Sequence, residues 1–464
     1  MRYVSTRGSS PPVSFLDAVL QGLAPDGGLY VPETWPRAAA EGAQPFFDVT
    51  AADVLAAFAG GDLSEDEVNT AIVAAYDWSA FSNPAITPLR QIGDENWILE
   101  LFHGPSLAFK DIAMRLLAEL YELALNKRNE RRTIICATSG DTGGAAVEAL
   151  KGRDRIDLIV LLPKGRVSEV QRRFMTTAEA DNVFAVVVDG DFDQCQAIVK
   201  SLFADRDFAA RASLSPVNSI NWARIAAQSI YFITASHTLA AAGPVNFVVP
   251  TGNFGDAFAG YVAKQMGAPI GTILLATNSN DILVGAVERG EYAKAAHSKA
   301  TLSPAMDIQV ASNFERLVFE ALGRDGEATR RLYEQFAQSG AFALPPAAQT
   351  AIRTTFRAAS VDDARTLAMM RSVYDSCDML ICPHTAVGIA APARTDLQMA
   401  HPIVTLATAH PAKFPETVEE ATGMRAELPA KCADLFARRE KFDTLPADTE
   451  AVKTYIQQRT RAWR

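Results

Sequence analysis

A lysine near the start of a predicted helix is the first residue that could carry covalent chemistry. In the segment HGPSLAFKDIAMRLLAEL (103–120), apolar residues recur at helical spacing after Gly104 and Pro105. We predict a helix with Ser106 as its N-cap, which places Lys110 in the first turn. The helix dipole and burial both lower the pKa of an amine there, and a Schiff-base lysine must be neutral. The alternative is a solvated lysine on an amphipathic helix.

Two glycine-rich turns each follow an apolar run and precede a helical pattern. TGNFGD (251–256) follows VNFVVP, and TSGDTGG (138–144) follows TIICAT. Glycine lets the backbone approach a ligand closely, and free amides at a helix start attract anions. We therefore expect the first turn to bind a phosphate and the second a carboxylate, although each could be an ordinary turn. Neither matches GxxxxGK[ST] or GxGxxG, which disfavours a nucleoside triphosphate or dinucleotide site.

A third group of polar residues ends a late apolar run. VTLATAHPAKF (404–414) carries Thr405, Thr408 and His410 at or beyond the end of a predicted strand. In open α/β sheets, ligands bind outside the carboxyl ends of the strands. We therefore expect this segment, the two turns and Lys110 to converge. His103 is expected to be structural or to form a wall of the site.

The elements that must position these residues alternate between short apolar runs and helices. Such runs are typical of parallel strands covered on both faces, so the fold class is α/β. We divide the chain into a partly helical region (1–88), a smaller α/β domain (89–235) and a larger α/β domain (236–464), and assign no function to 290–375. The predicted strands are 96–102, 133–138, 157–163, 183–190, 245–250, 272–277, 379–383 and 402–408.

Composition limits the possible partners and the compartment. Of 464 residues, 48% are hydrophobic, and the net charge of −10 argues against nucleic acid or an anionic membrane as partner. A small phosphorylated substrate remains possible, because a local pocket can be basic on an acidic protein. Five scattered cysteines without a CxxC pair indicate reduced thiols and no metal site. No signal-peptide core and no apolar run of about 18 residues occur, so we expect a cytoplasmic protein.

Four motifs in order resemble one family. HGPSLAFKD, TSGDTGG, PTGNFGD and ATAHPAKF, with SFLDAVLQGLAPDGGLYVP (14–32), resemble the threonine synthases, which are fold-type II pyridoxal-phosphate enzymes. The likeness runs from about residue 14 past residue 415. It implies two open, mostly parallel α/β sheet domains plus a small N-terminal region, in a monomer or homodimer. It also implies conversion of O-phospho-L-homoserine and water to L-threonine and phosphate.

The resemblance also implies roles for individual residues. Lys110 matches the lysine that forms the internal aldimine with pyridoxal 5′-phosphate and then moves protons. Thr408 matches the hydroxyl that meets the pyridine nitrogen, although Thr405 is close enough to be an alternative. The remaining matches are the cofactor-phosphate loop (Gly252, Asn253, Phe254, Gly255), the substrate-carboxylate loop (Thr138, Ser139, Thr142) and, in NSINWAR, the substrate-phosphate residues (Asn218, Ser219, Arg224).

One residue departs from the wider pattern, and three other functions are alternatives to the one that the resemblance implies. More distant relatives of the fold carry asparagine where this chain has Asp141; the carboxyl either keeps the contact to the cofactor in protonated form or gives it up. The nearest rival is a pyridoxal-phosphate phospho-lyase that yields a keto acid, ammonia and phosphate. An inactive regulatory relative conflicts with the intact motifs. A nicotinamide oxidoreductase lacks its glycine loop.

Overall fold

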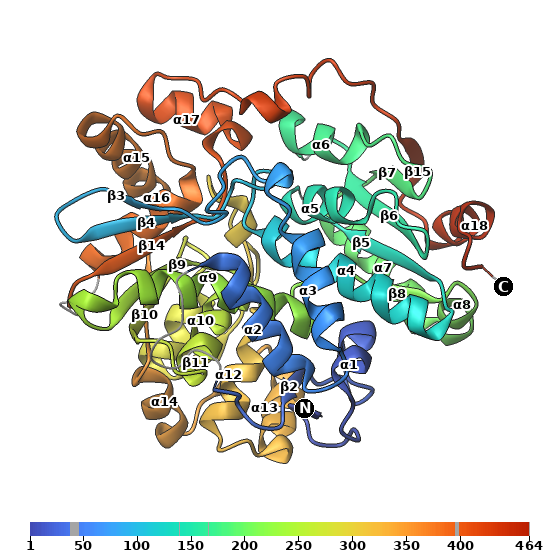
Figure 1. Cartoon of the computed structure of the whole chain (residues 1–464), viewed down its shortest axis with the longest axis horizontal. Helices are drawn as coiled ribbons and strands as arrows, with labels where there is room; N and C mark the ends of the chain where they lie inside the picture. Colours follow the sequence, from blue (N-terminus) through green and yellow to red (C-terminus); the bar gives the residue numbers. More distant parts are fainter. Residues whose placement is uncertain (38–45, 139, 166, 395–398, 464) are drawn as a thin grey trace.

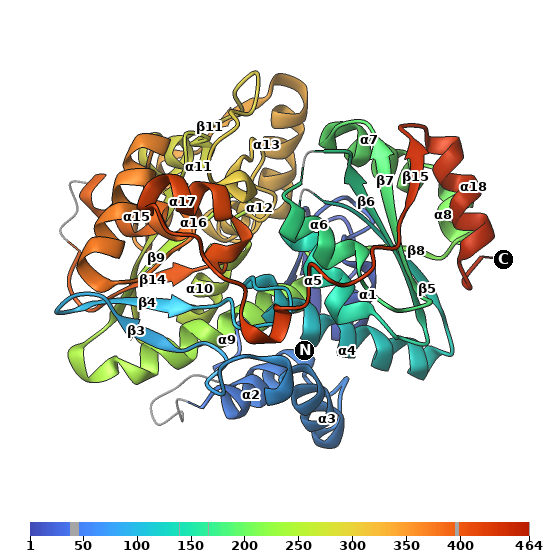
Figure 2. The ribbon, with the colours of Figure 1, turned by 90° about the horizontal axis from the view of Figure 1, so that it is seen from above.

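Two β-sheets, each covered by helices, and a small N-terminal region make up the molecule (Figures 1 and 2). The structure is a computed structural model, which describes residues 1–37, 46–138, 140–165, 167–394 and 399–463. The larger sheet runs in the order β13 (Phe356–Ser360), β10 (Ile270–Thr277), β9 (Val245–Pro250), β14 (Ile403–Ala407), β4 (Asn96–Glu100) and β3 (Leu89–Gln91). The smaller runs in the order β15 (Asp443–Pro446), β7 (Val183–Asp189), β6 (Ile156–Pro163), β5 (Arg132–Ala137) and β8 (Leu214–Pro216).

Nearly all strand pairs in these two sheets are parallel, which confirms the predicted α/β class. Only β3 and β4 pair antiparallel, at the edge of the larger sheet. Every residue of β6, β9 and β14 is buried. Helices cover both faces of each sheet, and this burial is why the strands appear in the sequence as continuous apolar runs.

The helices near the candidate site connect strands or follow them directly. They are α4 (Lys110–Arg128), α5 (Asp141–Leu150), α6 (Glu169–Thr176), α9 (Trp222–Thr238), α10 (Gly255–Gln265), α12 (Phe314–Ala321) and α16 (Pro383–Ala390). Outside the N-terminal region, the other described helices of eight or more residues are α7 (Phe192–Ala204), α13 (Gly326–Ser339), α14 (Pro346–Arg353), α15 (Asp363–Cys377), α17 (Pro415–Thr422) and α18 (Thr449–Arg459).

Two helices of the N-terminal region, α2 (Phe47–Ala59) and α3 (Glu65–Ala75), lie below both sheets in the view of Figure 2. The region also contains a two-stranded sheet, β1 (Tyr3–Ser5) with β2 (Tyr30–Pro32), and the helix α1 (Phe15–Gln21). The fully buried Trp222 of α9 contacts the rings of Tyr3 and Phe58, with ring centroids 5.8 and 5.3 Å away. This region is therefore joined to the main core by aromatic packing.

Sheet membership crosses the predicted domain boundaries at two places. β3 and β4 lie after residue 88 but belong to the larger sheet, because β4 pairs with β14. The last strand, β15, belongs to the smaller sheet through β7, and the chain after α17 crosses from one sheet to the other (Figures 1 and 2). That the chain divides into independent domains at residues 88 and 235 remains a prediction.

The first turn of α4 differs from the prediction. We expected a helix capped by Ser106, but α4 begins at Lys110. Ser106 instead bonds to Asp111, whose carboxylate accepts the Ser106 amide at 2.9 Å and its hydroxyl at 2.6 Å. Leu107 has a φ of 61°, so the backbone turns there and cannot be helical. The later start makes Lys110 the first helical residue.

The strand predicted at 379–383 is wrong. The described chain there forms no strand and leads into α16 at Pro383. Met379 and Ile381 are buried beside Ile98 and Ala407, so the apolar residues fill the core without a backbone partner. A short apolar run does not by itself reveal whether its backbone will be paired.

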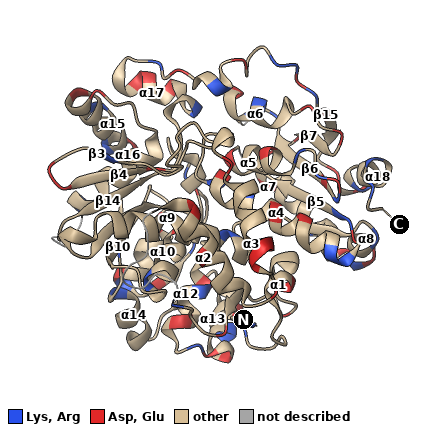
Figure 3. Ribbon diagram, in the orientation of Figure 1, with Lys and Arg blue, Asp and Glu red and all other residues tan. Residues whose placement is uncertain are grey.

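Charges of both signs occur on the outer helices (Figure 3). A bilayer-crossing helix must be long and apolar, and no helix in the described part of the chain meets both conditions.

Candidate active site

One cavity between the two sheets collects most of the predicted site residues. Its walls come from the segments that follow β5, β8, β9 and β14, together with the start of α4 and of α16. Its lining includes Phe109, Lys110, Asp141, Thr142, Ser219, Arg224, Gln228, Gly252, Asn253, Phe254, Gly255, Asp256, Met306, His384 and Thr408. The carboxyl ends of parallel strands from both sheets therefore meet at this cavity, as expected for an open α/β fold.

The amine of Lys110 lies in the cavity, and its side chain is only 12% exposed. Its Nζ is 3.5 Å from Asp141 Oδ2 and 4.6 Å from the centre of the Phe109 ring. Burial lowers the pKa of Lys110, and the nearby cations of Lys413 and Arg224 add to this effect, while Asp141 opposes it. The predicted direction is confirmed, and a lowered pKa increases the neutral form that covalent chemistry requires.

Asp141 forms a buried polar cluster behind this amine. Its Oδ1 is 2.8 Å from Lys413 Nζ and accepts a hydrogen bond from Gln171 Nε2 at 2.9 Å. Burial alone would raise the pKa of Asp141, but Lys413 and Lys110 hold it well below its usual range. Of the two expected states of Asp141, this environment therefore disfavours the protonated one.

The turn after β9 has the geometry of an anion-binding helix start. Phe254 has a φ of 64°, and α10 begins at the next residue. Its ring is buried against Phe314 with centroids 5.4 Å apart, so only its backbone is offered to a ligand. A side chain at Gly252 would put its Cβ 2.8 Å from Ile308 Cγ1, which leaves room for glycine alone. The first turn of a helix has amides without intrahelical acceptors, and these attract phosphate.

Asp256 lies in the first turn of α10, and burial raises its pKa to about 7. Its Oδ1 accepts a hydrogen bond from the Ala257 amide at 2.8 Å, while Oδ2 is buried without a partner among the described residues. At neutral pH this carboxyl is therefore about half protonated, which reduces its repulsion of an anion in the adjacent turn.

We expect Asp256→Asn to stabilise the apoprotein more at pH 8 than at pH 5. Because the pKa is raised in the folded state, the folded state binds more protons, and stability falls as pH rises from about 4 to about 7. Asparagine does not titrate and carries no such penalty. We therefore expect the difference in free energy of unfolding between the variant and the unsubstituted protein to grow by about 1–3 kcal/mol from pH 5 to pH 8. Urea unfolding measures it; an equal effect at both pH values would contradict the assignment.

Arg224 is a buried cation without a described partner. It is 3% exposed, and its Nε and Nη1 atoms form no hydrogen bond with the described residues. Burial lowers the pKa of Arg224 to about 10, so the guanidinium stays charged at neutral pH. Leaving a buried charge unpaired is costly unless a ligand neutralises it. Ser219 lines the same cavity, and a hydroxyl and a guanidinium are both suited to a phosphate.

We expect Arg224→Met to weaken substrate binding and stabilise the apoprotein. Loss of charge-assisted hydrogen bonds should lower kcat/KM about 100-fold or more. Removal of the unpaired buried charge should raise the free energy of unfolding by about 1–2 kcal/mol. Steady-state kinetics measures the change in kcat/KM, and urea unfolding in a buffer without phosphate measures the change in the free energy of unfolding. Inorganic phosphate, which the turn at 252–255 can also bind, should raise the melting temperature of the unsubstituted protein more than that of the variant; a variant that responds equally would contradict the role of Arg224.

The structure separates the predicted residues into two groups. The cavity is lined by most of them: Lys110, Thr142, Ser219, Arg224, the 252–255 turn and Thr408. Thr405, in contrast, lies within β14. Thr138 and Asn218 are not among the described lining residues. The Thr138 hydroxyl accepts hydrogen bonds from the Gly140 and Gly143 amides, and the Asn218 side chain accepts one from Ile220, so both order their loops. Ser139 lies outside the described residues.

Three further residues at the site were not singled out from the sequence. Lys413 is 1% exposed and donates to Ser106 O at 2.7 Å as well as to Asp141. Gln171 and His384 come from α6 and α16, and burial lowers the pKa of His384 to about 4, so that its ring is neutral. Lys413 stood in the quoted motif ATAHPAKF, but only folding brings it to Asp141.

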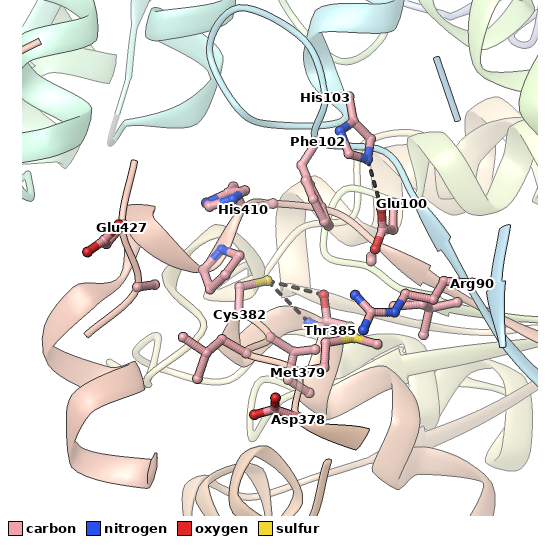
Figure 4. A pocket seen from close by; sticks show the side chains of 17 residues that line it. Arg90, Glu100, Phe102, His103, Asp378, Met379, Cys382, Thr385, His410 and Glu427 are labelled. Carbon is pink, nitrogen blue, oxygen red and sulfur yellow. Dashed lines mark hydrogen bonds and ion pairs between the residues drawn. The ribbon is translucent and has the colours of Figure 1, made fainter. Parts of the chain in front are cut away.

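A second, larger cavity lies on the other side of the wall formed by α16 and the segment after β14. On α16 and just before it, Cys382 and Thr385 line the second cavity, whereas His384 lines the first. After β14, His410 lines the second cavity, whereas Thr408 lines the first. Figure 4 shows His103 paired with Glu100 at one side of this cavity, with Arg90 on the same side. His103 Nε2 is 2.8 Å from Glu100 Oε2, which places His103 outside the Lys110 cavity.

Family models match the chain in three successive parts. Residues 2–76 match the threonine synthase N terminus, residues 82–409 match pyridoxal-phosphate dependent enzymes, and residues 385–456 match the threonine synthase C-terminal model. The threonine synthase of Pseudomonas aeruginosa is 44% identical over 465 residues, covering 99% of this chain and 98% of that protein. The chain belongs to the threonine synthase family.

Solved structures of threonine synthases agree with this fold over the whole chain. The pyridoxal-phosphate-bound threonine synthase of Brucella melitensis is 46% identical, with a TM-score of 0.95, and covers 99% of this chain and 100% of its own. The yeast threonine synthase is 36% identical, with a TM-score of 0.92 and coverage of 99% and 98%. Two threonine synthases thus match both sheets and the N-terminal region as one arrangement.

The residues of this threonine synthase family member fit pyridoxal 5′-phosphate. Lys110 has a buried amine that could bond an aldehyde, and the turn at 252–255 has amides at the start of α10 that could bind a phosphate. Thr408 supplies a neutral hydroxyl at the end of β14. Arg224 remains as a second position for an anion, because its guanidinium is buried and unpaired in the described part of the chain.

Proposed function

We propose that this protein is a threonine synthase that converts O-phospho-L-homoserine and water to L-threonine and phosphate. The single observation that carries the proposal is the content of one cavity: a buried amine with a lowered pKa, a helix start suited to the cofactor phosphate, and a separate unpaired guanidinium. A second anion position is needed when the substrate as well as the cofactor carries a phosphate. A small aldehyde cofactor alone would leave Arg224 unneutralised.

We infer the following division of labour between the residues. Lys110, the turn at 252–255 and Thr408 hold pyridoxal 5′-phosphate, which supplies an electron sink for the removal of protons from carbon. The neutral hydroxyl of Thr408 has no charge to keep the ring nitrogen protonated, in contrast to a carboxylate. Thr142, at the start of α5, binds the substrate carboxylate, because amides and hydroxyls there favour an anion.

Proton transfer is assigned to Nζ of Lys110. This amine takes the α-proton and then the β-proton, and it returns one proton to the γ-carbon and, after water has added, one to the α-carbon. Asp141 lies 3.5 Å away and limits how far the pKa of Lys110 falls, while Lys413 offsets that effect. The lowered pKa of Lys110 makes it easier for the amine to release a proton that it has taken up.

Arg224 and Ser219 are assigned to the substrate phosphate. The bond from the γ-carbon to oxygen breaks while charge builds on the departing phosphate, and a fixed guanidinium stabilises that charge without reorganisation. Water then adds its oxygen to the β-carbon, and its proton passes to the departed phosphate. The burial of Arg224 strengthens its interaction with the phosphate, because a low-dielectric site screens charges weakly.

The decisive experiment measures the products. Purified protein with O-phospho-L-homoserine should release inorganic phosphate and threonine in equal amounts, the threonine being identified by amino-acid chromatography. A keto acid with ammonia in place of threonine would instead support the related phospho-lyase. No phosphate release by protein loaded with cofactor would contradict both activities.

We also infer that the enzyme works in the cytoplasm on a small-molecule substrate, as a monomer or homodimer. All five cysteines are described as free thiols, which is typical of a reducing compartment.

A further inference from the structure

A buried asparagine lies between the two phosphate-binding segments of the cavity. Asn313 is fully buried immediately before α12, within the 290–375 segment. Its Nδ2 donates to the Ser219 carbonyl at 3.1 Å and to the Asn253 carbonyl at 3.2 Å. Its backbone amide also donates to Asn253 O at 3.1 Å. One side-chain amide therefore joins the candidate substrate-phosphate segment to the candidate cofactor-phosphate turn.

The two joined segments belong to different sheets. Ser219 follows β8 of the smaller sheet, whereas Asn253 follows β9 of the larger sheet. A side chain at Gly255 would place its Cβ 3.3 Å from Asn313 Nδ2, so the turn fits closely against this amide. Asn313 thus spans the boundary between the sheets at the point where both anion positions must be held.

Arg316 fixes the orientation of Asn313. Its Nη1 donates to Asn313 Oδ1, and this contact leaves Nδ2 as the atom that faces the two carbonyls. The same guanidinium donates through Nε to Tyr30 O at 3.0 Å and through Nη2 to Ile220 O at 2.6 Å. Arg316 is fully buried, so its hydrogen bonds form away from competing water. The N-terminal region is therefore connected to the phosphate segments through β2.

We propose that Asn313 is a positioning residue that sets the separation between the substrate-phosphate and cofactor-phosphate sites, with Arg316 as its anchor. The inference rests on the proposed function, because it takes Ser219 and the 252–255 turn as two anion sites. A substrate bound at its phosphate and at the cofactor must span a fixed distance, and small displacements in such sites reduce the rate strongly. The N-terminal region acts on the site through this connection.

The variant Asn313→Asp separates positioning from packing. It keeps the shape of the side chain and the acceptor for Arg316, and it removes both N–H donors to the carbonyls. Asn182→Asp is the matched control. Asn182 is also buried, donates to Leu150 O at 2.8 Å and Ile156 O at 2.9 Å, and accepts from the Gly152 amide, away from the described cavity lining.

Three constants decide the proposal. They are the Kd of the apoprotein for pyridoxal 5′-phosphate, the Kd of the holoenzyme for inorganic phosphate, and the KM for O-phospho-L-homoserine at saturating cofactor. We expect Asn313→Asp to raise each about tenfold, which corresponds to one or two lost hydrogen bonds. Asn182→Asp should lower the melting temperature and leave all three within twofold. If Asn313→Asp does not fold, Asn313→Ala and Arg316→Lys are measured in the same way.

The outcomes separate this proposal from the proposed function. A variant with all three constants within twofold of the unsubstituted protein overturns the positioning role, and so does a change in only one of the two Kd values. An equal change in Asn182→Asp shows a general loss of stability and also overturns it. Neither Kd requires turnover, so a protein that makes no threonine would refute the function while the two Kd values still decide the role of Asn313.

Discussion

Replacing Lys110 with alanine is expected to abolish threonine formation, with a loss of at least about 1,000-fold. The amine is the only described lysine nitrogen lining the cavity, and both the covalent bond to the cofactor aldehyde and the proton transfers are assigned to it. The visible absorbance of that bond should disappear as well. Steady-state kinetics and an absorption spectrum of the purified variant measure the two effects.

Lys264→Ala is a suitable control for this experiment. Lys264 lies on α10, is half-buried with a pKa lowered by burial, and donates to Gly271 O at 2.7 Å. It is not among the described residues that line the cavity, so its loss should leave both the absorbance and the turnover intact. Persistence of either signal in Lys110→Ala would refute the assignment of Lys110.

The second large effect is expected from Lys413→Met. Methionine fills the space but leaves the buried Asp141 carboxylate, 6% exposed, without its partner at 2.8 Å. Removing one member of a buried ion pair costs about 3–5 kcal/mol. Because the pKa of Asp141 is lowered in the folded state, its ionised form contributes stability above about pH 4, and this contribution is lost as pH falls further. Urea unfolding at pH 7 measures the loss.

Asp141→Asn in the Lys413→Met background tests whether the pair causes this effect. Asparagine carries no charge and can still accept the hydrogen bond from Gln171 Nε2, so the double variant should regain most of the stability. In the single variant, Asp141 keeps Lys110 as its remaining cation, so the pKa of Lys110 should rise and the acid limb of the pH–rate profile should move to higher pH. Additive losses in the double variant would show that the two side chains do not interact.

Local sequence features predicted the parts of this protein that depend on local physics. Apolar runs such as VNFVVP and DLIVLLP became β9 and β6, because a strand buried on both faces needs apolar residues at every position. The turn at 252–255 was predictable because glycine is required where the backbone turns sharply and packs closely. Lys110 and the 252–255 turn, both predicted from local sequence features, do line the cavity.

Other features depended on contacts between distant segments. Ser106 resembles an N-cap, but its side chain donates to Asp111 and its carbonyl accepts a hydrogen bond from the distant Lys413, and α4 begins only at Lys110. Residues 379–383 resemble a strand, but the structure gives their backbone no strand partner. No local rule distinguishes these outcomes, because each is decided by which groups the rest of the chain brings within bonding distance.

The amino-acid sequence was thus sufficient for the fold class, the family resemblance and the main ligand-binding segments, since glycine turns, helix starts and buried strands have local signatures. Tertiary structure decided how those segments work together. Lys413 reaches Asp141 across more than 270 positions, and Asn313 reaches Ser219 and Asn253 from a segment without a sequence motif of its own. Hydrogen bonds and ion pairs of this kind depend on distances of a few ångströms, and only the packing of the two sheets and the N-terminal region sets those distances.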